Sequence, residues 1–428
     1  MNTSRYFSMT ALTAAIALGL TACGGGSSTT SSLDGSTASV TGVITGFGSI
    51  FVNGVEYETN GANIVIDGKP GTEDDLRVGM VVTLEGSASG NSGTAVSISF
   101  SDEMEGPIES VSVAADGTGT LTVMGQNVEI TADTVFDSNV AGVTAVEQLA
   151  QGHIVEISGY GDGAGNVIAT RIELKAPDAL TYLNNGNDDL ELKGLISNLD
   201  TTNKTFQIGN MTVNYSGATL EGELSNGLQE GVYVEVKFRV DANGNLVVAK
   251  IELENEGKKG PKGEEGEDHE IKGAVVGSPS GSMFNIGGQE IIVTASTEFE
   301  GVSMGQIDHG TYIEVEGYFD AEGRLVAREI KMERKHGSSG CSEIEGTVSD
   351  ISLDDGAVNS GAVTIGTTMV YIDNSTIMED DVDESSRFNL SKLNQGDRVE
   401  VRACADGDRL VAAKLERDDD SSGSDDNS

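Results

Sequence analysis

The sequence has no tryptophan and few prolines, cysteines, histidines and basic residues, and these scarcities limit what the protein can be. Its 428 residues include 5 prolines, 3 cysteines and 4 histidines. The 26 Lys and Arg residues face 69 Asp and Glu residues, which gives a formal net charge of -43. A field of this sign repels polyanions. We therefore expect no nucleic-acid partner and no electrostatic docking to anionic lipid.

The sequence also lacks the usual groupings of catalytic residues. The histidines stand in separate segments without the H-x-x-x-H spacing that presents two imidazoles to one metal. There is no G-x-S-x-G nucleophile turn and no phosphate-binding G-x-x-x-x-G-K loop. Paired carboxylates are a weak signal in so acidic a chain, so a carboxylate-based hydrolase is kept only as a second alternative. We expect no catalytic residues, no metal ligands, no cofactor and no enzymatic activity.

The N-terminal segment is apolar but short. Met9 to Leu20 falls well below the roughly 20 residues of a bilayer-spanning helix, and Arg5 precedes it. The stretch from Leu20 to Cys23 reads Leu-Thr-Ala-Cys, which is a bacterial lipobox. We expect residues 1–22 to be a lipoprotein signal peptide, Cys23 to carry acyl chains such as palmitate, and residues 23–38 to form a flexible tether. An ordinary secretory signal with a chance cysteine is the alternative.

The anchor also predicts a location. The residue after Cys23 is Gly24 rather than aspartate, which resembles outer-membrane sorting in Gram-negative lipoproteins. We expect a lipid-anchored protein of the cell envelope, at the outer membrane, with the membrane contacted through the lipid.

Glycine is abundant, with 57 residues, and it marks a pattern that occurs five times. Each copy opens with a glycine inside an alternating strand, and later has a leucine-like residue, two residues, a second glycine and another alternating strand. The opening glycines are Gly42, Gly106, Gly194, Gly273 and Gly346, and the later ones are Gly79, Gly152, Gly231, Gly310 and Gly396.

Period-2 alternation bounded by Gly, Asp and Asn turns predicts strands and hairpins. We expect an all-β fold of five tandem five-stranded barrels, resembling oligonucleotide/oligosaccharide-binding (OB) barrels, or sandwiches. Hinges would join them into an elongated string, with helical turns only in 141–150 and part of 379–392. The expected repeats are 39–101, 102–176, 190–254, 270–334 and 335–417, the linkers 177–189 and 255–269, and the disordered acidic tail 418–428.

Several segments resemble a known family. They are the strand around Gly42, the hairpin 46–54, the segment 76–82 and the strand 105–108. They are similar to bacterial lipoproteins built from repeats of domain of unknown function 5666. The resemblance spans nearly the whole mature chain and implies architecture and location, because the family carries no assigned activity.

The other two cysteines both lie in the fifth copy. Cys341 precedes its opening strand and Cys404 follows a later strand. An isolated pair outside the cytoplasm usually oxidises, so we expect a disulfide between Cys341 and Cys404.

Two further features bear on ligands. The turns Asp241–Asn245, Asp320–Gly323 and Asp406–Asp408 could offer oxygens for a weak calcium association, but Asp and Gly there are better explained by hairpin backbone angles. Tyrosines could form a glycan platform, although a tyrosine among strand residues is more often core; they are Tyr57, Tyr160, Tyr233, Tyr312 and Tyr318. We expect a noncatalytic envelope spacer or interaction module for a protein or glycan, with a glycan-binding adhesion protein as the first alternative.

Overall fold

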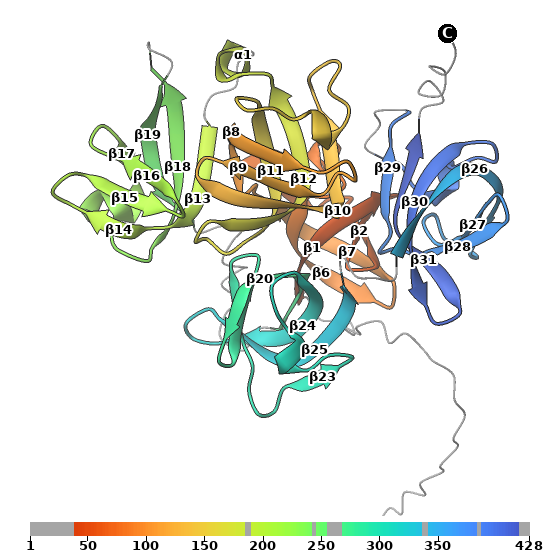
Figure 1. Cartoon of the computed structure of the whole chain (residues 1–428). Helices are drawn as coiled ribbons and strands as arrows, with labels where there is room; N and C mark the ends of the chain where they lie inside the picture. Colours follow the sequence, from red (N-terminus) through yellow and green to blue (C-terminus); the bar gives the residue numbers. More distant parts are fainter. Residues whose placement is uncertain are drawn as a thin grey trace, which may run out of the picture.

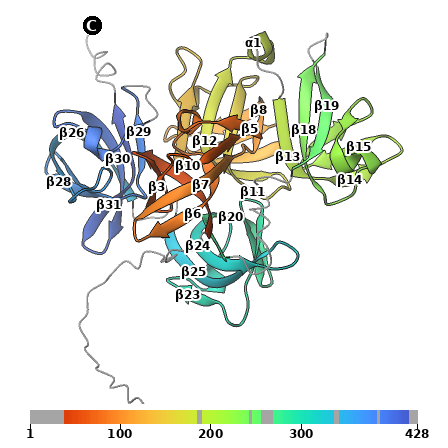
Figure 2. The same ribbon diagram turned by 180° about the vertical axis from the view of Figure 1, so that it is seen from behind.

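The computed structural model describes residues 38–184, 190–241, 245–254, 268–335, 341–382 and 387–418. These residues fold into five β-barrels in chain order. The first barrel lies at the centre, the second, fourth and fifth surround it, and the third lies beyond the second (Figure 1, Figure 2). The all-β fold class expected from the sequence is therefore observed.

The elements follow one plan in all copies. The first barrel has β1 (Ala38–Phe47), β2 (Ile50–Val52), β3 (Val55–Glu58), β4 (Asn63–Ile66), β5 (Lys69–Gly71), a 3-10 turn (Glu73–Asp75), β6 (Val81–Ser89) and β7 (Ser92–Phe100). The second has β8 (Met104–Val113), β9 (Gly119–Val123), β10 (Gln126–Ser138), a 3-10 turn (Val146–Gln148), β11 (Ile154–Gly161) and β12 (Asn166–Ala176), followed by the helix α1 (Ala179–Asn184).

The third barrel has β13 (Leu190–Leu195), β14 (Ser197–Asp200), β15 (Thr205–Ile208), β16 (Met211–Asn214), β17 (Thr219–Leu220), a 3-10 turn (Gly222–Asn226), β18 (Tyr233–Val240) and β19 (Leu246–Leu253). The fourth has β20 (Asp268–Ser280), β21 (Met283–Ile286), β22 (Gln289–Ile292), β23 (Glu298–Glu300), a 3-10 turn (Met304–Gln306), β24 (Thr311–Phe319) and β25 (Leu325–Lys335). The fifth has β26 (Cys341–Leu353), β27 (Gly361–Ile365), β28 (Thr368–Ile372), β29 (Ile377–Asp380), a 3-10 turn (Leu390–Lys392), β30 (Arg398–Asp406) and β31 (Arg409–Asp418).

Strand pairing closes the barrels. In the first, β1 pairs with β2, β2 with β3, β3 in parallel with β7, β7 with β6, and β6 with β1. The second, fourth and fifth barrels close the same way. In the described part of the third barrel, β14, β15 and β16 form a separate small sheet, so that ring stays partly open. This strand order is that of an OB-type barrel.

The later recurrent glycine has a backbone role that explains its repetition. Its φ angle is 88° at Gly79 and 103° at Gly396, and it is positive in all five copies. The N–H of Gly79 donates to the carbonyl oxygen of Ile44 at 2.9 Å, and Gly396 donates to Val348 at the same distance. A side chain is disfavoured at such angles, so glycine here lets the chain turn back onto the opening strand.

The opening glycine has a packing role. A Cβ placed on Gly42 would lie 1.9 Å from the Asn53 side chain, and one on Gly106 would lie 2.1 Å from the Met124 sulfur. The corresponding neighbours are Ile208 in the third copy and Ile365 in the fifth, whereas a Cβ on Gly273 in the fourth would meet Tyr160 at 2.5 Å and Ile286 at 2.9 Å. The opening glycine thus makes room for a side chain from the hairpin that the opening strand pairs with.

Among the described residues, four of the five opening strands (β1, β8, β13, β20 and β26) also join barrels, and the exception is β26. β1 pairs in parallel with β20, with Ser39 opposite His269, and we call this contact the 1–4 seam. β8 pairs antiparallel with β13, with Glu105 opposite Glu191, and we call it the 2–3 seam. The seams merge the first and fourth barrels into one sheet and the second and third into another.

The expectation of an elongated string of hinged beads is wrong, because the barrels share cores. One apolar cluster runs through the second and third barrels. Val135 of the second barrel and Ile377 of the fifth pack into the core of the first. Tyr160 of the second barrel packs into the core of the fourth. Seam pairing and shared cores replace the hinges.

The helical content also differs from the expectation of helical turns only in 141–150 and part of 379–392, because the first, third and fourth barrels have 3-10 turns as well. The two expected regions hold 3-10 turns, but α1 lies in 177–189, which the sequence suggested was a linker. Its Tyr182 is 3% exposed and packs into the core shared by the second and third barrels. No helix among the described residues is long and apolar enough to cross a bilayer.

Candidate binding cleft between three barrels

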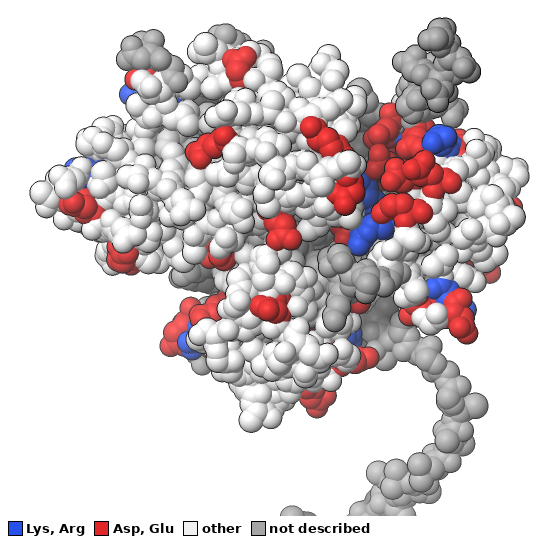
Figure 3. Space-filling model, viewed as in Figure 1, with Lys and Arg blue, Asp and Glu red and all other residues white. Residues whose placement is uncertain are grey.

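A cleft of about 810 Å³ lies where the first, second and fifth barrels meet. Carboxylates are its main polar lining, and Figure 3 shows acidic residues gathered along the boundary between the second and fifth barrels. The carboxylates are Asp67, Asp75, Asp137, Glu156, Glu173, Glu379, Asp380, Asp381 and Asp418, and the basic residues are Arg77, Arg171 and Lys175. The lining therefore has six more acidic than basic side chains.

Buried basic residues hold the second-barrel side of the cleft. Arg171 on β12 lies 2.6 Å from Asp137 and 3.4 Å from Glu173. Its guanidinium also donates to the carbonyl oxygen of Val78 at 3.3 Å, which ties the second barrel to the first. Burial alone would lower the pKa of Arg171, but the neighbouring carboxylates raise it, so this residue is a permanent cation.

The fifth-barrel side has the same construction. Lys414 on β31 binds Glu379 and, at 3.1 Å, Glu416. Arg417 binds Asp380 at 2.7 Å. Burial raises the pKa of Glu379 to about 7 in spite of Lys414. Each of these carboxylates on β29 and β31 is thus held by a base from its own barrel.

Three carboxylates of the cleft, Asp75, Asp137 and Asp381, are exposed, one from each of its three barrels. Of the aromatic rings that line the cleft, Phe100 and Phe388 are each 2% exposed and Phe136 is half-buried. The cleft therefore offers negative charge and little aromatic surface. Such a lining suits a cationic ligand better than a sugar ring, which stacks on exposed aromatic faces.

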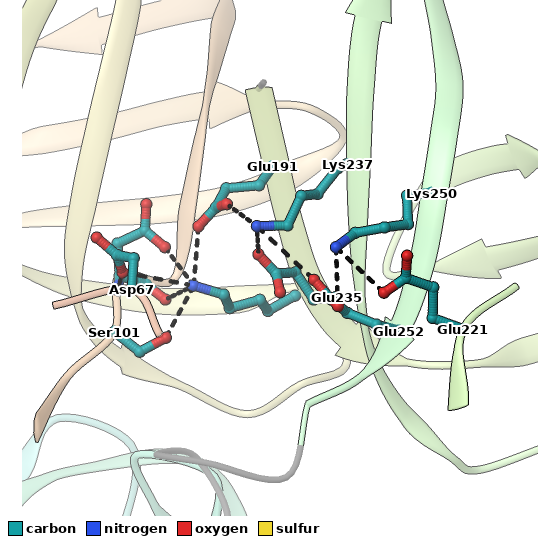
Figure 4. Close-up of polar contacts among 10 residues, drawn as sticks. Asp67, Ser101, Glu191, Glu221, Glu235, Lys237, Lys250 and Glu252 are labelled. Carbon is teal, nitrogen blue, oxygen red and sulfur yellow. Dashed lines mark hydrogen bonds and ion pairs between the residues drawn. The ribbon is translucent and has the colours of Figure 1, made fainter. Parts of the chain in front are cut away.

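A second charged cluster fills the 2–3 seam (Figure 4). Lys193 is buried, and its ammonium lies 2.6 Å from Asp102, 2.9 Å from Glu191 and 3.9 Å from Asp67. Burial alone would lower the pKa of Lys193, but these carboxylates raise it well above its usual value. Lysines and carboxylates continue outward through Lys237 and Lys250 (Figure 4).

This cluster resembles a metal site only in its carboxylates. Asp67, Asp102 and Glu191 each have an oxygen within 4.8 Å of the others. The Lys193 ammonium takes the place that a cation would need, since it contacts all three carboxylates. The cluster is therefore an ion-pair network that joins barrels.

The cysteines divide into two cases. Cys23, the expected lipidation site, lies outside the described residues. Cys341 on β26 and Cys404 on β30 stand opposite each other and form a disulfide, with a Cα–Cα distance of 3.9 Å. This bond ties the opening strand of the fifth barrel to its neighbour.

The tyrosines considered for a glycan platform are mostly buried. Tyr57, Tyr160 and Tyr233 are 2%, 1% and 8% exposed. The Tyr160 hydroxyl donates to the carbonyl oxygen of Lys272 at 2.8 Å, which links the second and fourth barrels. Only Tyr318 among the five is exposed, at 38%. Tyr160 is therefore a junction residue.

The Asp-bearing turns use their carboxylates locally. Asp320 accepts from the backbone N–H groups of Glu322 and Arg324 at 3.0 and 2.9 Å, and Arg324 also pairs with it. Asp241 accepts from the N–H of Asn245 at 2.9 Å. These bonds match the hairpin explanation of the turns.

The histidines are dispersed, as expected. His269 is buried in the 1–4 seam, and His309 contacts Glu129 of the second barrel at 2.9 Å. His153 is half-buried and lies just after Gly152, and His336 lies outside the described residues.

Sequence reasoning missed the residues that join the barrels. Lys193 and Asp102 lie 91 positions apart, and Arg402 pairs with Asp133 from another barrel. One signal was available, which is the residue before each opening glycine. It is threonine in one copy, glutamate in two and lysine in two, although the surrounding pattern stays the same: Thr41, Glu105, Lys193, Lys272 and Glu345.

Comparison with solved structures gives remote likenesses, among them the two that follow. Drosophila Unr CSD456 is 16% identical with a TM-score of 0.13, and the match covers 54% of this chain and 98% of that one. A multidomain protein with nucleic acid binding domains from Streptococcus pneumoniae TIGR4 is 12% identical with a TM-score of 0.14, covering 54% of this chain and 72% of that one. No curated protein matches the chain.

A family model matches all five barrels. The matched segments are residues 38–99, 105–173, 193–252, 272–331 and 345–416. Together they cover well over half of the chain and coincide with the five strand rings. The chain belongs to the family described as domain of unknown function (DUF5666), which it contains in five copies.

Proposed function

We propose that this protein is a noncatalytic lipoprotein of the cell envelope, anchored at the outer membrane through Cys23, whose five barrels form a scaffold for a partner protein with a basic surface. The observation that carries the proposal is the cleft, where three barrels together present an excess of carboxylates. Such a field attracts and orients cationic partners.

The way the barrels are joined supports a scaffold rather than a flexible spacer. The first, second and fifth barrels are held together by buried contacts: Arg171 donates to the carbonyl oxygen of Val78, Ile377 packs into the first core, and Arg402 pairs with Asp133. A surface assembled from three barrels keeps its shape only if the barrels do not move independently. Preorganisation of this kind lowers the entropy cost of binding.

The charge pairing supports the noncatalytic part of the proposal. Glu156 and Glu379 in the cleft, and Asp102 and Glu191 in the 2–3 seam, contact lysine at salt-bridge distance. A general acid or nucleophile must instead reach a substrate. The glycan-adhesion alternative has less support, because Tyr57, Tyr160 and Tyr233 are buried.

The anchor is tested with a Cys23→Ala variant. We expect it to lose acyl label and to leave the membrane fraction, because the lipid is the membrane contact. Unchanged membrane retention of the variant would refute the lipoprotein assignment.

The cleft is tested with a photo-crosslinking residue at position 381, on the rim of the cleft. Its matched control carries the same crosslinker at Glu109, an exposed carboxylate outside the cleft lining. We expect one basic partner to crosslink at 381 and not at 109. Equal crosslinking at both positions, or turnover on a hydrolase substrate panel, would contradict the proposed function.

A further inference from the structure

The opening strand of the fifth barrel has an open edge. Residues Cys341 to Thr347 of β26 pair with β30 on one side. The strand β27 pairs only from Val348 onward. Within the described part of the chain, no strand pairs with the other side of 341–347.

The equivalent edge is covered in the other four barrels. The segment just before the opening glycine pairs across the 1–4 seam in β1 and β20 and across the 2–3 seam in β8 and β13. Both parallel and antiparallel pairing occur, so this edge accepts a strand in either direction. The first and fourth barrels form one pair and the second and third form another, so among the described strands the opening strand of the fifth barrel has no partner barrel.

Burial shows the same contrast at matched positions. The residue three places before the glycine is at most 7% exposed in four copies, as in Glu191 and Glu270, whereas Glu343 is exposed. The residue directly before the glycine is buried in Lys193 and Lys272, whereas Glu345 is exposed. The edge of β26 therefore has the sequence motif of a seam strand but no partner strand against it among the described residues.

The charge of this edge indicates what would cover it. In the 2–3 seam, acidic β8 is met by β13, whose Lys193 reaches Asp102 just before β8. Strand β26 is also acidic, with Glu343 and Glu345 on the edge segment and Glu400 opposite Glu345 on β30. Arg398 of β30 lies 3.4 Å from Glu345, but it is shared with Asp418 at 3.2 Å. The neighbouring Arg402 is already bound to Asp133 in the second barrel. A strand with lysine or arginine would complement this edge as β13 complements β8.

A second copy of the chain is a poor occupant. Two antiparallel β26 edges would bring Glu343 and Glu345 of one copy against the same residues of the other, and like charges directly opposite are destabilising. Each chain also has a formal net charge of -43, which opposes self-association.

We propose that the free edge of β26 binds an extended, lysine- or arginine-bearing segment of a partner protein, which adds to the fifth barrel as a further strand. Main-chain hydrogen bonds would hold the segment, and its basic side chains would meet Glu343 and Glu345. This inference rests on the proposed function, because both describe the chain as a binding protein for basic partners.

The test titrates the full chain, held in neutral detergent, with a synthetic peptide of alternating lysine and valine. We expect saturable binding that protects the amides of 341–347 from hydrogen exchange. The variant Glu343→Lys with Glu345→Lys should weaken binding by about tenfold or more, as expected when complementary charge is reversed. The control Glu109→Lys with Glu147→Lys makes the same change of net charge at exposed sites elsewhere and should leave binding nearly unchanged.

A second peptide separates strand addition from general attraction to an acidic protein. Methylating alternate backbone nitrogens removes hydrogen-bond donors and leaves the charge intact, so this peptide should bind about tenfold or more weakly. Equal binding of the two peptides, equal effects of the two charge reversals, or a two-chain particle in which β26 is protected without peptide would each overturn the inference. None of these results would change the crosslinking outcome at the cleft, so the two proposals fail separately.

Discussion

The opening strands of the first four barrels and that of the fifth have the same glycine motif but different surroundings. Strands β1, β8, β13 and β20 are paired across seams, and the residue three places before the glycine is buried in each of these copies, whereas Ser342, Glu343 and Glu345 of β26 are exposed. The motif builds the barrel in every copy, through the opening glycine and the contact with the later glycine. The residues just before the opening glycine differ, and they determine what can lie against the edge.

The two seams differ from each other as well. The 2–3 seam contains the Lys193 network, and its Glu105, whose pKa burial raises to about 8, lies opposite Glu191. A protonated Glu105 at neutral pH removes the like-charge repulsion across that pair. The 1–4 seam has the uncharged pair Ser39 and His269 instead. Substitutions should therefore affect the two seams and the open edge in different ways.

The largest expected effect is at Lys193. Lys193→Met leaves the buried carboxylates of Asp102 and Glu191 without their cation. We expect the free energy of unfolding at pH 7 to fall by about 3–5 kcal/mol, measured by urea denaturation. Lys250→Met, at a lysine whose side chain is 30% exposed, should cost less than about 1 kcal/mol. Equal losses would mean that burial of Lys193 does not set its contribution.

The disulfide should matter next. Cys341 and Cys404 are 63 positions apart, and their bond restricts the unfolded fifth barrel. Cys341→Ser with Cys404→Ser should lower the stability of that barrel by about 2–4 kcal/mol, seen as an earlier thermal transition. Reductant should shift the wild-type transition in the same way and leave the double variant unchanged. A wild-type transition that does not respond to reductant would contradict this role.

The 1–4 seam should weaken in acid through His269. Burial lowers the pKa of His269 to about 3, from a usual value of 6.5. The unfolded chain therefore takes up a proton first as the pH falls below 6.5, and the folded state loses about 2 kcal/mol from this group by pH 5. His269→Phe should remove that loss.

The measurement is the difference in unfolding free energy between the wild type and His269→Phe from pH 8 to pH 5. The neighbouring Glu270, whose pKa burial raises to about 7, acts in the opposite direction but is present in both proteins. The difference therefore isolates His269. Parallel curves for the two proteins would show that His269 does not titrate in this way.

The smallest effect concerns the later glycine of the fifth barrel. Gly396→Ala places a side chain at a φ of 103° and should cost about 1 kcal/mol. Gly305→Ala, where a Cβ would meet nothing within 4 Å and φ is not positive, should cost clearly less. Chemical denaturation of both variants measures the comparison, and equal costs would argue against the backbone explanation.

The barrels were predictable from the sequence because their determinants are local. Alternation, turn residues and the two recurrent glycines all act within one copy, and they predicted five OB-like barrels. The pairing of Cys341 with Cys404 could be predicted for the same reason, since their strands are neighbours in one barrel.

The assembly of the barrels was not predictable, because its determinants join distant residues. Lys193 and Asp102, Tyr160 and Lys272, and Arg402 and Asp133 each link different copies, and alternation within one copy carries no information about them. For the same reason the cleft, which needs three barrels, could not be found from one repeat at a time. Only the variable residue before each opening glycine hinted that the copies pack differently.

Residue-resolved hydrogen exchange of the full chain tests most directly whether seams cover four opening strands and leave the fifth free. We predict that the seam amides of Glu105, Lys193 and Glu270, which face the partner strand, exchange slowly; the Lys193 N–H, for example, donates to the carbonyl oxygen of Glu103 at 3.3 Å. The outward-facing amides of β26 between Cys341 and Thr347 should exchange at least about tenfold faster. Protection of the β26 edge equal to that of the seams, or exchange at the seams as fast as at β26, would contradict the account.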